Sequence, residues 1–189
     1  MISRKEHGRK IFHVLVWMAV VGLYVLLDRI NYGFLFITSL FFVVLIIDIL
    51  RLYVGLSIPI FSLLRKKEKK TFFTPTKTLF GMVITLAFFD KNIAVASFLM
   101  MIFGDAAAPL IGQYGKHWFT FNTKKNWEGA VGEFAVDMLI GMILLRSWLI
   151  SGMMALVATL VEVHNKHWDD NMVIPFAASL IGTLVKTIF

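Results

Sequence analysis

A stretch of small residues at 104–116 has the composition of a phosphate site. It reads Gly-Asp-Ala-Ala-Ala-Pro-Leu-Ile-Gly-Gln-Tyr-Gly-Lys and ends an apolar run. A carboxylate there, Asp105, is costly to keep next to lipid and by default indicates a functional site. Glycines let a phosphate approach the backbone, and Lys116 offers it a point charge. The stretch is not a Walker A loop. The alternative is tight helix packing with Asp105 paired to a lysine.

Two acids farther along share a helix face. Glu133 and Asp137 are four residues apart, so they point to the same side of a helix. Acids in a membrane helix require a partner, a metal ion or a water-filled cavity. Just before them, Lys124, Lys125, Asn126 and Glu128 form a basic, polar hinge. This hinge could hold polyphosphate and metal, or it could anchor the chain at the membrane surface.

The segment 162–171 supplies oxygen ligands. Glu162, Asp170 and Asn171 carry the hard ligands that Mg²⁺ prefers while it bridges to phosphates. His164 and His167 make zinc an alternative. At the other end of the chain, one helical turn brings His13 close to Arg9 and Lys10, and these three residues add cationic groups.

These residues lie between long apolar segments. The chain has 189 residues, 58% of them hydrophobic, and a mean hydropathy of +0.77. That composition leaves too little polar material to cover the surface of a soluble domain of this size. The net charge of +7 comes from short basic clusters between apolar runs, which suits lipid headgroups and gives no folded basic surface for nucleic acid. With no cysteine, disulfides and thiolate sites are excluded.

We predict an all-α transmembrane bundle, one domain over residues 1–189. Crossing the bilayer takes roughly 20 apolar residues. The chain offers about seven such segments, at 11–27, 32–50, 72–89, 93–111, 129–145, 148–163 and 172–188, with a shorter interfacial piece at 52–64. A cytoplasmic N-terminus would place fourteen of the nineteen Lys and Arg residues inside and four outside. The five histidines then lie at or near the cytoplasmic side, together with six acids: Asp48, Asp105, Glu128, Glu162, Asp169 and Asp170.

The motifs as a set resemble the CTP-dependent lipid-alcohol kinases, the family of dolichol kinase, phytol kinase and yeast-type diacylglycerol kinase. The matching residues run in the family's order and are Arg9-Lys10 with His13, Asp48 with Arg51, Gly104-Asp105 with Ala108 and 112–116, Lys125 with Glu128-Gly129, and Asp170-Asn171 with Pro175. Ala130 departs from the pattern, where a small hydroxyl residue is expected. We interpret the Asp48–Arg51 pair, three residues apart on one helix face, as structural.

The resemblance implies transfer of the γ-phosphoryl group of CTP, with Mg²⁺, to a membrane lipid alcohol such as a polyprenol, an isoprenoid alcohol or diacylglycerol. The predicted site then has three groups. Catalytic candidates are Asp105, Glu128, Glu133 and Asp137. Candidates for binding nucleotide and phosphate are Arg9, Lys10, His13, Gly104, Gly112, Gly115, Lys116, Lys124, Lys125 and Asn171. Candidate metal ligands are Asp105, Glu162 and Asp170.

Two rival functions stay open at this point, as does a purely structural membrane subunit, which would bind no nucleotide. A CTP:phosphatidate cytidylyltransferase also joins CTP, Mg²⁺ and a lipid, but it releases pyrophosphate. A small transporter would use Glu133 and Asp137 as midplane carboxylates. The expected partners are CTP, the lipid alcohol and the bilayer, with the oligomeric state, a homo-oligomer included, left open. We expect a multi-pass protein of the cell membrane, or of the endoplasmic reticulum in a eukaryote.

Overall fold

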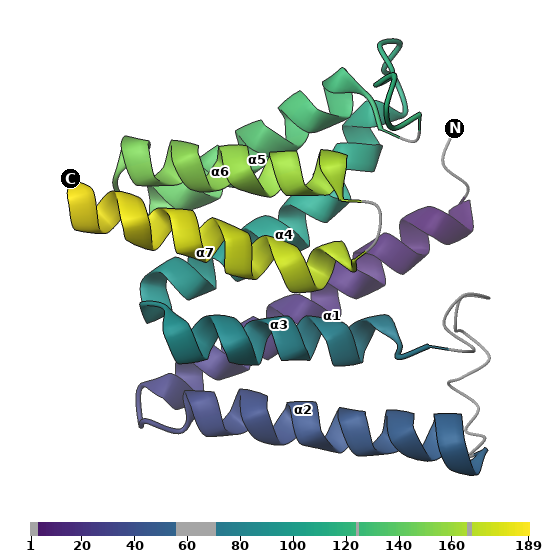
Figure 1. Ribbon diagram of the computed structural model, residues 1–189, viewed down its shortest axis with the longest axis vertical. Helices are drawn as coiled ribbons and strands as arrows, with labels where there is room; N and C mark the ends of the chain where they lie inside the picture. The colour runs from purple at the N-terminus through teal and green to yellow at the C-terminus, as the bar shows by residue number, and fades with distance from the viewer. Residues whose placement is uncertain (1–3, 56–70, 124, 166–167) are drawn as a thin grey trace.

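The structure, a computed structural model, describes residues 4–55, 71–123, 125–165 and 168–189, with side chains from residue 8 onward except Arg9. These residues form seven α-helices and one π-helical turn (Figure 1). The elements are α1 (Arg4–Asp28), α2 (Gly33–Ile49), η1 (Leu50–Val54), α3 (Thr74–Phe88), α4 (Lys91–Gly112), α5 (Trp127–Leu145), α6 (Trp148–His164) and α7 (Asp170–Ile188). The all-α prediction is confirmed, and every predicted apolar segment is a helix. Most of the predicted piece at 52–64 lies outside the described residues.

Four of the described helices are long and apolar enough to cross a membrane. They span Lys10–Asp28, Gly33–Val54, Lys91–Gly112 and Asp170–Ile188. The helices α3 and α6, with 15 and 17 residues, are about 22 and 26 Å long, short of the ~30 Å hydrocarbon core. Helix α5 has the length but carries three acids. The chain is therefore a multi-pass membrane protein, while seven spans and a cytoplasmic N-terminus stay predictions.

Helix α4 lies at the centre of the bundle. It contacts α1, α3, α5, α6 and α7, and Ala94, Ala96 and Phe98 along it are fully buried. Small residues let neighbouring helices approach each other closely, as is usual in membrane proteins. The hydroxyl of Ser179 on α7, for example, donates a hydrogen bond to Ser97 on α4 at 2.9 Å. These five helices are thus positioned against α4.

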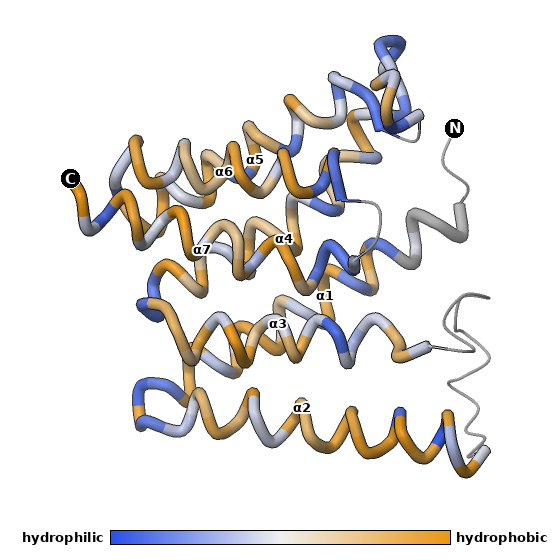
Figure 2. The backbone as a smooth tube through the Cα atoms, in the orientation of Figure 1, coloured by the Kyte–Doolittle hydropathy of each residue, from blue (hydrophilic) through white to orange (hydrophobic). Residues whose placement is uncertain are grey.

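The ends of the helices divide the molecule into two faces. Helices α1, α3, α5 and α7 begin at the end where α2, α4 and α6 finish, and we call this the polar end (Figure 1). Hydrophilic segments gather at the helix ends and loops, and the segments between them are mostly hydrophobic (Figure 2). At the opposite end, Lys91 pairs with Asp28 at 3.0 Å and Lys186 with Asp90 at 3.4 Å.

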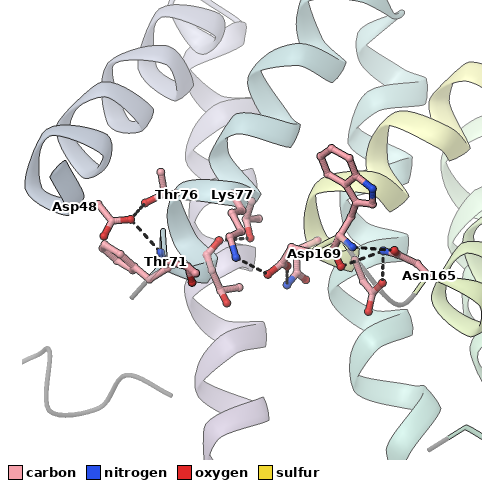
Figure 3. Close-up of polar contacts among 12 residues, drawn as sticks. Asp48, Thr71, Thr76, Lys77, Asn165 and Asp169 are labelled. Atoms are coloured by element: carbon pink, nitrogen blue, oxygen red, sulfur yellow. Dashed lines mark hydrogen bonds and ion pairs between the residues drawn. The ribbon is translucent and has the colours of Figure 1, made fainter. Parts of the chain in front are cut away.

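Asp48 joins α2 to α3 at the polar end. Its carboxylate is fully buried and lies 2.6 Å from the Arg51 guanidinium, so the structural pair predicted from the sequence is confirmed. It also accepts hydrogen bonds from the Phe73 amide and the Thr76 hydroxyl, both at 2.9 Å (Figure 3). Arg51 in turn donates to the carbonyl of Thr71 at 2.7 Å. Asp48 is therefore fully occupied in holding two helices together.

A second contact joins α3 to α7 at the same end. The ammonium of Lys77 lies 3.8 Å from the carboxylate of Asp169, and Asn171 donates to that carboxylate at 3.0 Å (Figure 3). Close to this contact the two helices touch, since a Cβ added at Gly81 would lie 2.8 Å from the carbonyl oxygen of Met172. Asp169 and Asn171 thus anchor the start of α7 and fix where the neighbouring Asp170 lies.

The Asp48 network leads to a stability prediction. The variant Asp48→Ala leaves the Arg51 guanidinium, whose side chain is 8% exposed, without its carboxylate. Removing one partner of a buried ion pair costs about 3–5 kcal/mol, so we expect a clearly lower unfolding temperature in detergent. The matched control is Asp28→Ala, whose partner Lys91 is 65% exposed and whose loss costs about 1 kcal/mol or less. Equal unfolding temperatures for the two variants would contradict this role of Asp48.

Candidate active site

A pocket opens at the polar end between α1, α4, α5, α6 and the loop that joins α4 to α5. Its volume is about 410 Å³, within the ~300–1,000 Å³ range of small-molecule sites. It is lined by Lys10, Asp105, Ala108, Pro109, Gly112, Gln113, Trp118, Lys125, Asn126, Gly129, Ala130, Glu133, Glu162 and Val163. Residues up to 153 positions apart in the sequence, from Lys10 to Val163, therefore face one cavity.

The first wall of the pocket joins α1 to α4. The Lys10 ammonium contacts the backbone carbonyl of Asp105 and lies 3.4 Å from its carboxylate. The imidazole of His13 lies 3.9 Å from the same carboxylate. The sequence-based expectation that Lys10, His13 and Asp105 share one site agrees with this geometry. The side chain of Arg9 and all of Lys124 lie outside the described residues.

The second wall carries the acids of α5. Glu133 and Asp137 are both about 1% exposed, on the shared helix face that their spacing predicts. Glu133 lines the pocket, and Asp137 lies one turn deeper. Within the described part of the chain, no group donates a hydrogen bond to Oε2 of Glu133 or to either carboxylate oxygen of Asp137. Gly104 makes room for them, because a Cβ added there would lie 2.8 Å from the Asp137 carboxylate.

The third wall is an ion pair between the loop and α6. The ammonium of Lys125 contacts the carboxylate of Glu162, which is about 1% exposed. Burial alone would lower the pKa of Lys125, but the Glu162 carboxylate outweighs it, and the pKa lies above its ordinary value. Lys125 therefore stays charged. Asp170 at the start of α7 interacts electrostatically with both groups and accepts a hydrogen bond from Asn165 at 2.8 Å.

The acids of the described residues do not by themselves form a metal site, and oxygens from a bound phosphate would have to complete one. Among the described residues, no group of three His, Asp or Glu side chains is close enough to hold an ion alone. Buried carboxylate oxygens without a donor are nevertheless suited to a cation, and Mg²⁺ completes its shell with water and phosphate oxygens. Of the predicted ligands, Glu162 has such an oxygen, Oε2, among the described residues, and Asp105, Glu162 and Asp170 all stay predictions. For the zinc alternative, His167 lies outside the described residues, and His164 stacks on Phe121.

Glu128 holds the loop and does not line the pocket. Its carboxylate accepts hydrogen bonds from the backbone N–H of Lys116 at 2.9 Å and lies 2.7 Å from Nδ1 of His117. These contacts, the Lys116 amide first, lower the pKa of Glu128 to about 2. Lys116 is exposed and is likewise absent from the lining of the pocket. This geometry favours a structural role for Glu128.

Asn126, which belongs to the polar hinge predicted from the sequence but not to the candidate site residues, is a central residue of the site. It donates to the carbonyl of Gly112 at 2.5 Å and accepts from the amide of Gly129 at 2.9 Å, and so it fastens α4 to α5. A Cβ at Gly112 would lie 2.7 Å from its amide oxygen, and one at Gly115 would collide with its amide nitrogen. These glycines therefore pack around Asn126, and contact with phosphate stays a prediction. Its position directly before a helix, where Asn is a favoured N-cap, was the available signal.

Comparison with known proteins finds a distant similarity to CTP-dependent diacylglycerol kinases of two fungi. CTP-dependent diacylglycerol kinase 1 of Saccharomyces cerevisiae is 24% identical over an alignment of 227 positions. The alignment covers 98% of this chain and 76% of the yeast protein. CTP-dependent diacylglycerol kinase 1 of Eremothecium gossypii is 24% identical over 214 residues, covering 95% and 67%. The resemblance inferred from the motifs is confirmed. No protein-family model matches the chain, and no solved structure matches it significantly.

The hydrogen bonds of Glu128 make the loop sensitive to acid. Because its pKa is lowered from 4.5 to about 2, its stabilising contribution is complete above pH 4.5 and is lost as the pH falls toward about 2. We expect the hydrogen-exchange protection of the Lys116 and His117 amides to fall over that interval. In Glu128→Gln the two amides should be poorly protected already at neutral pH and show no such dependence. Protection that persists at pH 2 would show that another group holds the loop.

Proposed function

We propose that this protein is a CTP-dependent kinase that transfers the γ-phosphoryl group to the hydroxyl of a membrane lipid alcohol. The observation that carries the proposal is a pocket at the polar end that combines cations, Lys10 and Lys125, with the carboxylates of Asp105, Glu133 and Glu162. Phosphoryl transfer requires groups that hold the phosphates in line and a carboxylate that orients or deprotonates the hydroxyl. The relation to CTP-dependent diacylglycerol kinases supports CTP as the donor.

Lys10 and Lys125 are the groups best suited to the phosphates. Both line the pocket, and both already pair with an acid that is a predicted metal ligand. An anionic triphosphate can compete for these ammonium groups and leave Asp105 and Glu162 available to Mg²⁺. Together with Asp170, these acids would hold the ion, and a bound Mg²⁺ would supply neutralisation of the phosphate charge. When the nucleotide binds, the two lysines therefore exchange the carboxylates for phosphates, and the carboxylates become free to hold Mg²⁺.

Glu133 is the residue we assign as the general base. Of the candidates on α5 it alone lines the pocket, since Glu128 holds the loop and Asp137 lies one turn deeper. Its carboxylate would take the proton of the lipid hydroxyl as the hydroxyl oxygen bonds to the γ-phosphorus. The bond from that phosphorus to the bridging oxygen breaks, and CDP leaves. Asp137 would act on this step only through Glu133.

The surroundings of the pocket suit a lipid substrate. Next to Lys10 on α1, Ile11 and Phe12 are 61% and 66% exposed, and next to Ala130 on α5, Val131 is 62% exposed. Apolar surface of this kind faces hydrocarbon when the helices lie in a bilayer. A lipid alcohol could keep its chain against these helices and bring its hydroxyl to the polar end. Diacylglycerol, polyprenols and isoprenoid alcohols all fit this description.

The decisive experiment supplies the purified protein with Mg²⁺, labelled CTP or ATP, and separately diacylglycerol, a polyprenol and a shorter isoprenoid alcohol. We expect one lipid to acquire phosphate from CTP and CDP to accumulate with it. Release of pyrophosphate and formation of a CDP-lipid would instead identify a cytidylyltransferase. Solute flux in sealed vesicles without consumption of nucleotide would identify a transporter. Either result would refute the proposed kinase activity.

The base assignment leads to a kinetic prediction. Glu133→Gln keeps the shape of the side chain but removes the proton acceptor, so kcat should fall roughly 10²–10⁴-fold while CTP still binds. The matched control is Asp28→Asn, which removes a carboxylate at the opposite end of the bundle and should keep its kcat. Full activity in Glu133→Gln, with loss in Asp137→Asn, would move the base one turn deeper into α5.

A further inference from the structure

Trp118 is an exposed aromatic residue that lines the same pocket as Lys10 and Lys125. It belongs to the loop between α4 and α5, and 53% of it is accessible. Exposed tryptophans are common where a membrane protein meets the lipid headgroups, and Trp127, Trp148 and Trp168 of this chain are exposed as well. Trp118 differs from these three because its side chain borders the cavity that holds the cations and acids.

The backbone holds Trp118 in place from both sides. Trp118 forms an antiparallel bridge with Asn126, and the next amide, that of Phe119, donates to the carbonyl of Lys125 at 3.1 Å. On the preceding side, the carbonyl of His117 accepts a hydrogen bond from the amide of Trp127 at 2.9 Å. The loop therefore presents Trp118 from a fixed backbone. The next residue, Phe119, is hydrogen-bonded directly to Lys125, one of the two cations of the pocket.

The neighbouring aromatic residues are used in packing, whereas Trp118 lines the pocket. Phe119 is 6% exposed and packs with Ala130 and Val163. The centroid of its ring also lies 4.6 Å from the ring centroid of Trp127 and 5.2 Å from that of Phe121. Over the described ranges, no ring contact is found for Trp118. The packing of Phe119 thus secures the loop and leaves the indole face of Trp118 available to a ligand.

We infer that Trp118 is the stacking platform for the base of the nucleotide whose phosphates Lys10 and Lys125 hold. The inference rests on the proposed function and adds to it the subsite that receives the base. Every nucleobase has a π-face, and stacking on an aromatic side chain is a general way to bind one. The base lies at the rim of the pocket on Trp118, and the phosphates extend toward Glu133 and Glu162.

Two ligands separate the base from the phosphates. Mg·CTP carries both, while inorganic tripolyphosphate with Mg²⁺ carries the phosphates alone. We would measure the affinity of the purified full-length protein for each by equilibrium dialysis. The variants are Trp118→Ala, which removes the stacking surface, and Trp118→Phe, which keeps an aromatic ring. Tyr114→Ala is the matched control, because Tyr114 is 77% exposed on the same loop and does not line the pocket.

In Trp118→Ala we expect binding of CTP to weaken roughly 5- to 150-fold, the range that loss of one stacked base implies. Tripolyphosphate should bind as it does to the unaltered protein, Trp118→Phe should keep most of the affinity for CTP, and Tyr114→Ala should keep all of it. The KM for CTP should rise in Trp118→Ala while kcat at saturating CTP stays near that of the unaltered protein.

Other results would refute the inference in distinguishable ways. Equal affinity for CTP in Trp118→Ala and the unaltered protein would show that the indole does not contact the base. Loss of CTP and tripolyphosphate binding together would show that Trp118 shapes the pocket or anchors the loop to the membrane. If the unaltered protein bound neither ligand and phosphorylated no lipid, the proposed function itself would fall, and the inference with it.

Discussion

Glu133, Asp137 and Glu162 bring three carboxyl groups into the interior of an apolar helix bundle, each about 1% exposed. Taking ions out of water costs several kcal/mol apiece unless partners compensate for the loss. Within the described residues, Lys125 pairs with Glu162, whereas Asp137 has no hydrogen-bond donor at either oxygen. Packing alone would favour apolar residues at these positions, so the three carboxyl groups mark the polar site around which the bundle is arranged.

The remaining parts of the polar end serve to hold these groups in place. Asn126 ties α4 to α5 directly beside the pocket, and Glu128 fixes the loop through the amides that follow Gly115. Gly104 leaves the space that the Asp137 carboxylate occupies. Asp48 is outside the pocket and closes α2 onto α3. Asp48 and Glu128 thus hold the fold together outside the cavity, whereas Asn126 both holds two helices together and lines the cavity.

The sequence predicted the helices well because apolar runs and helical periodicity are local properties. All seven segments are found, and the i, i+4 spacing correctly put Glu133 and Asp137 on one buried face. Partners distant in the sequence could not be read in this way. Nothing local indicates that Glu128 turns toward the amides of Lys116 and His117 while Glu133 lines the pocket. The polar residues 4–10 also continue α1, ahead of the apolar segment predicted to begin at residue 11.

The central claim is that one water-filled pocket at the polar end receives the nucleotide. The chain has no cysteine, so Gln113→Cys places a single thiol at the pocket, and Leu139→Cys, at a position 61% exposed on α5, serves as the control. In sealed vesicles, a membrane-impermeant maleimide should label position 113 from the side that carries the polar end, and Mg·CTP should block this labelling. Position 139 should stay unlabelled in lipid. Labelling at 113 that proceeds at the same rate with saturating Mg·CTP would contradict the claim.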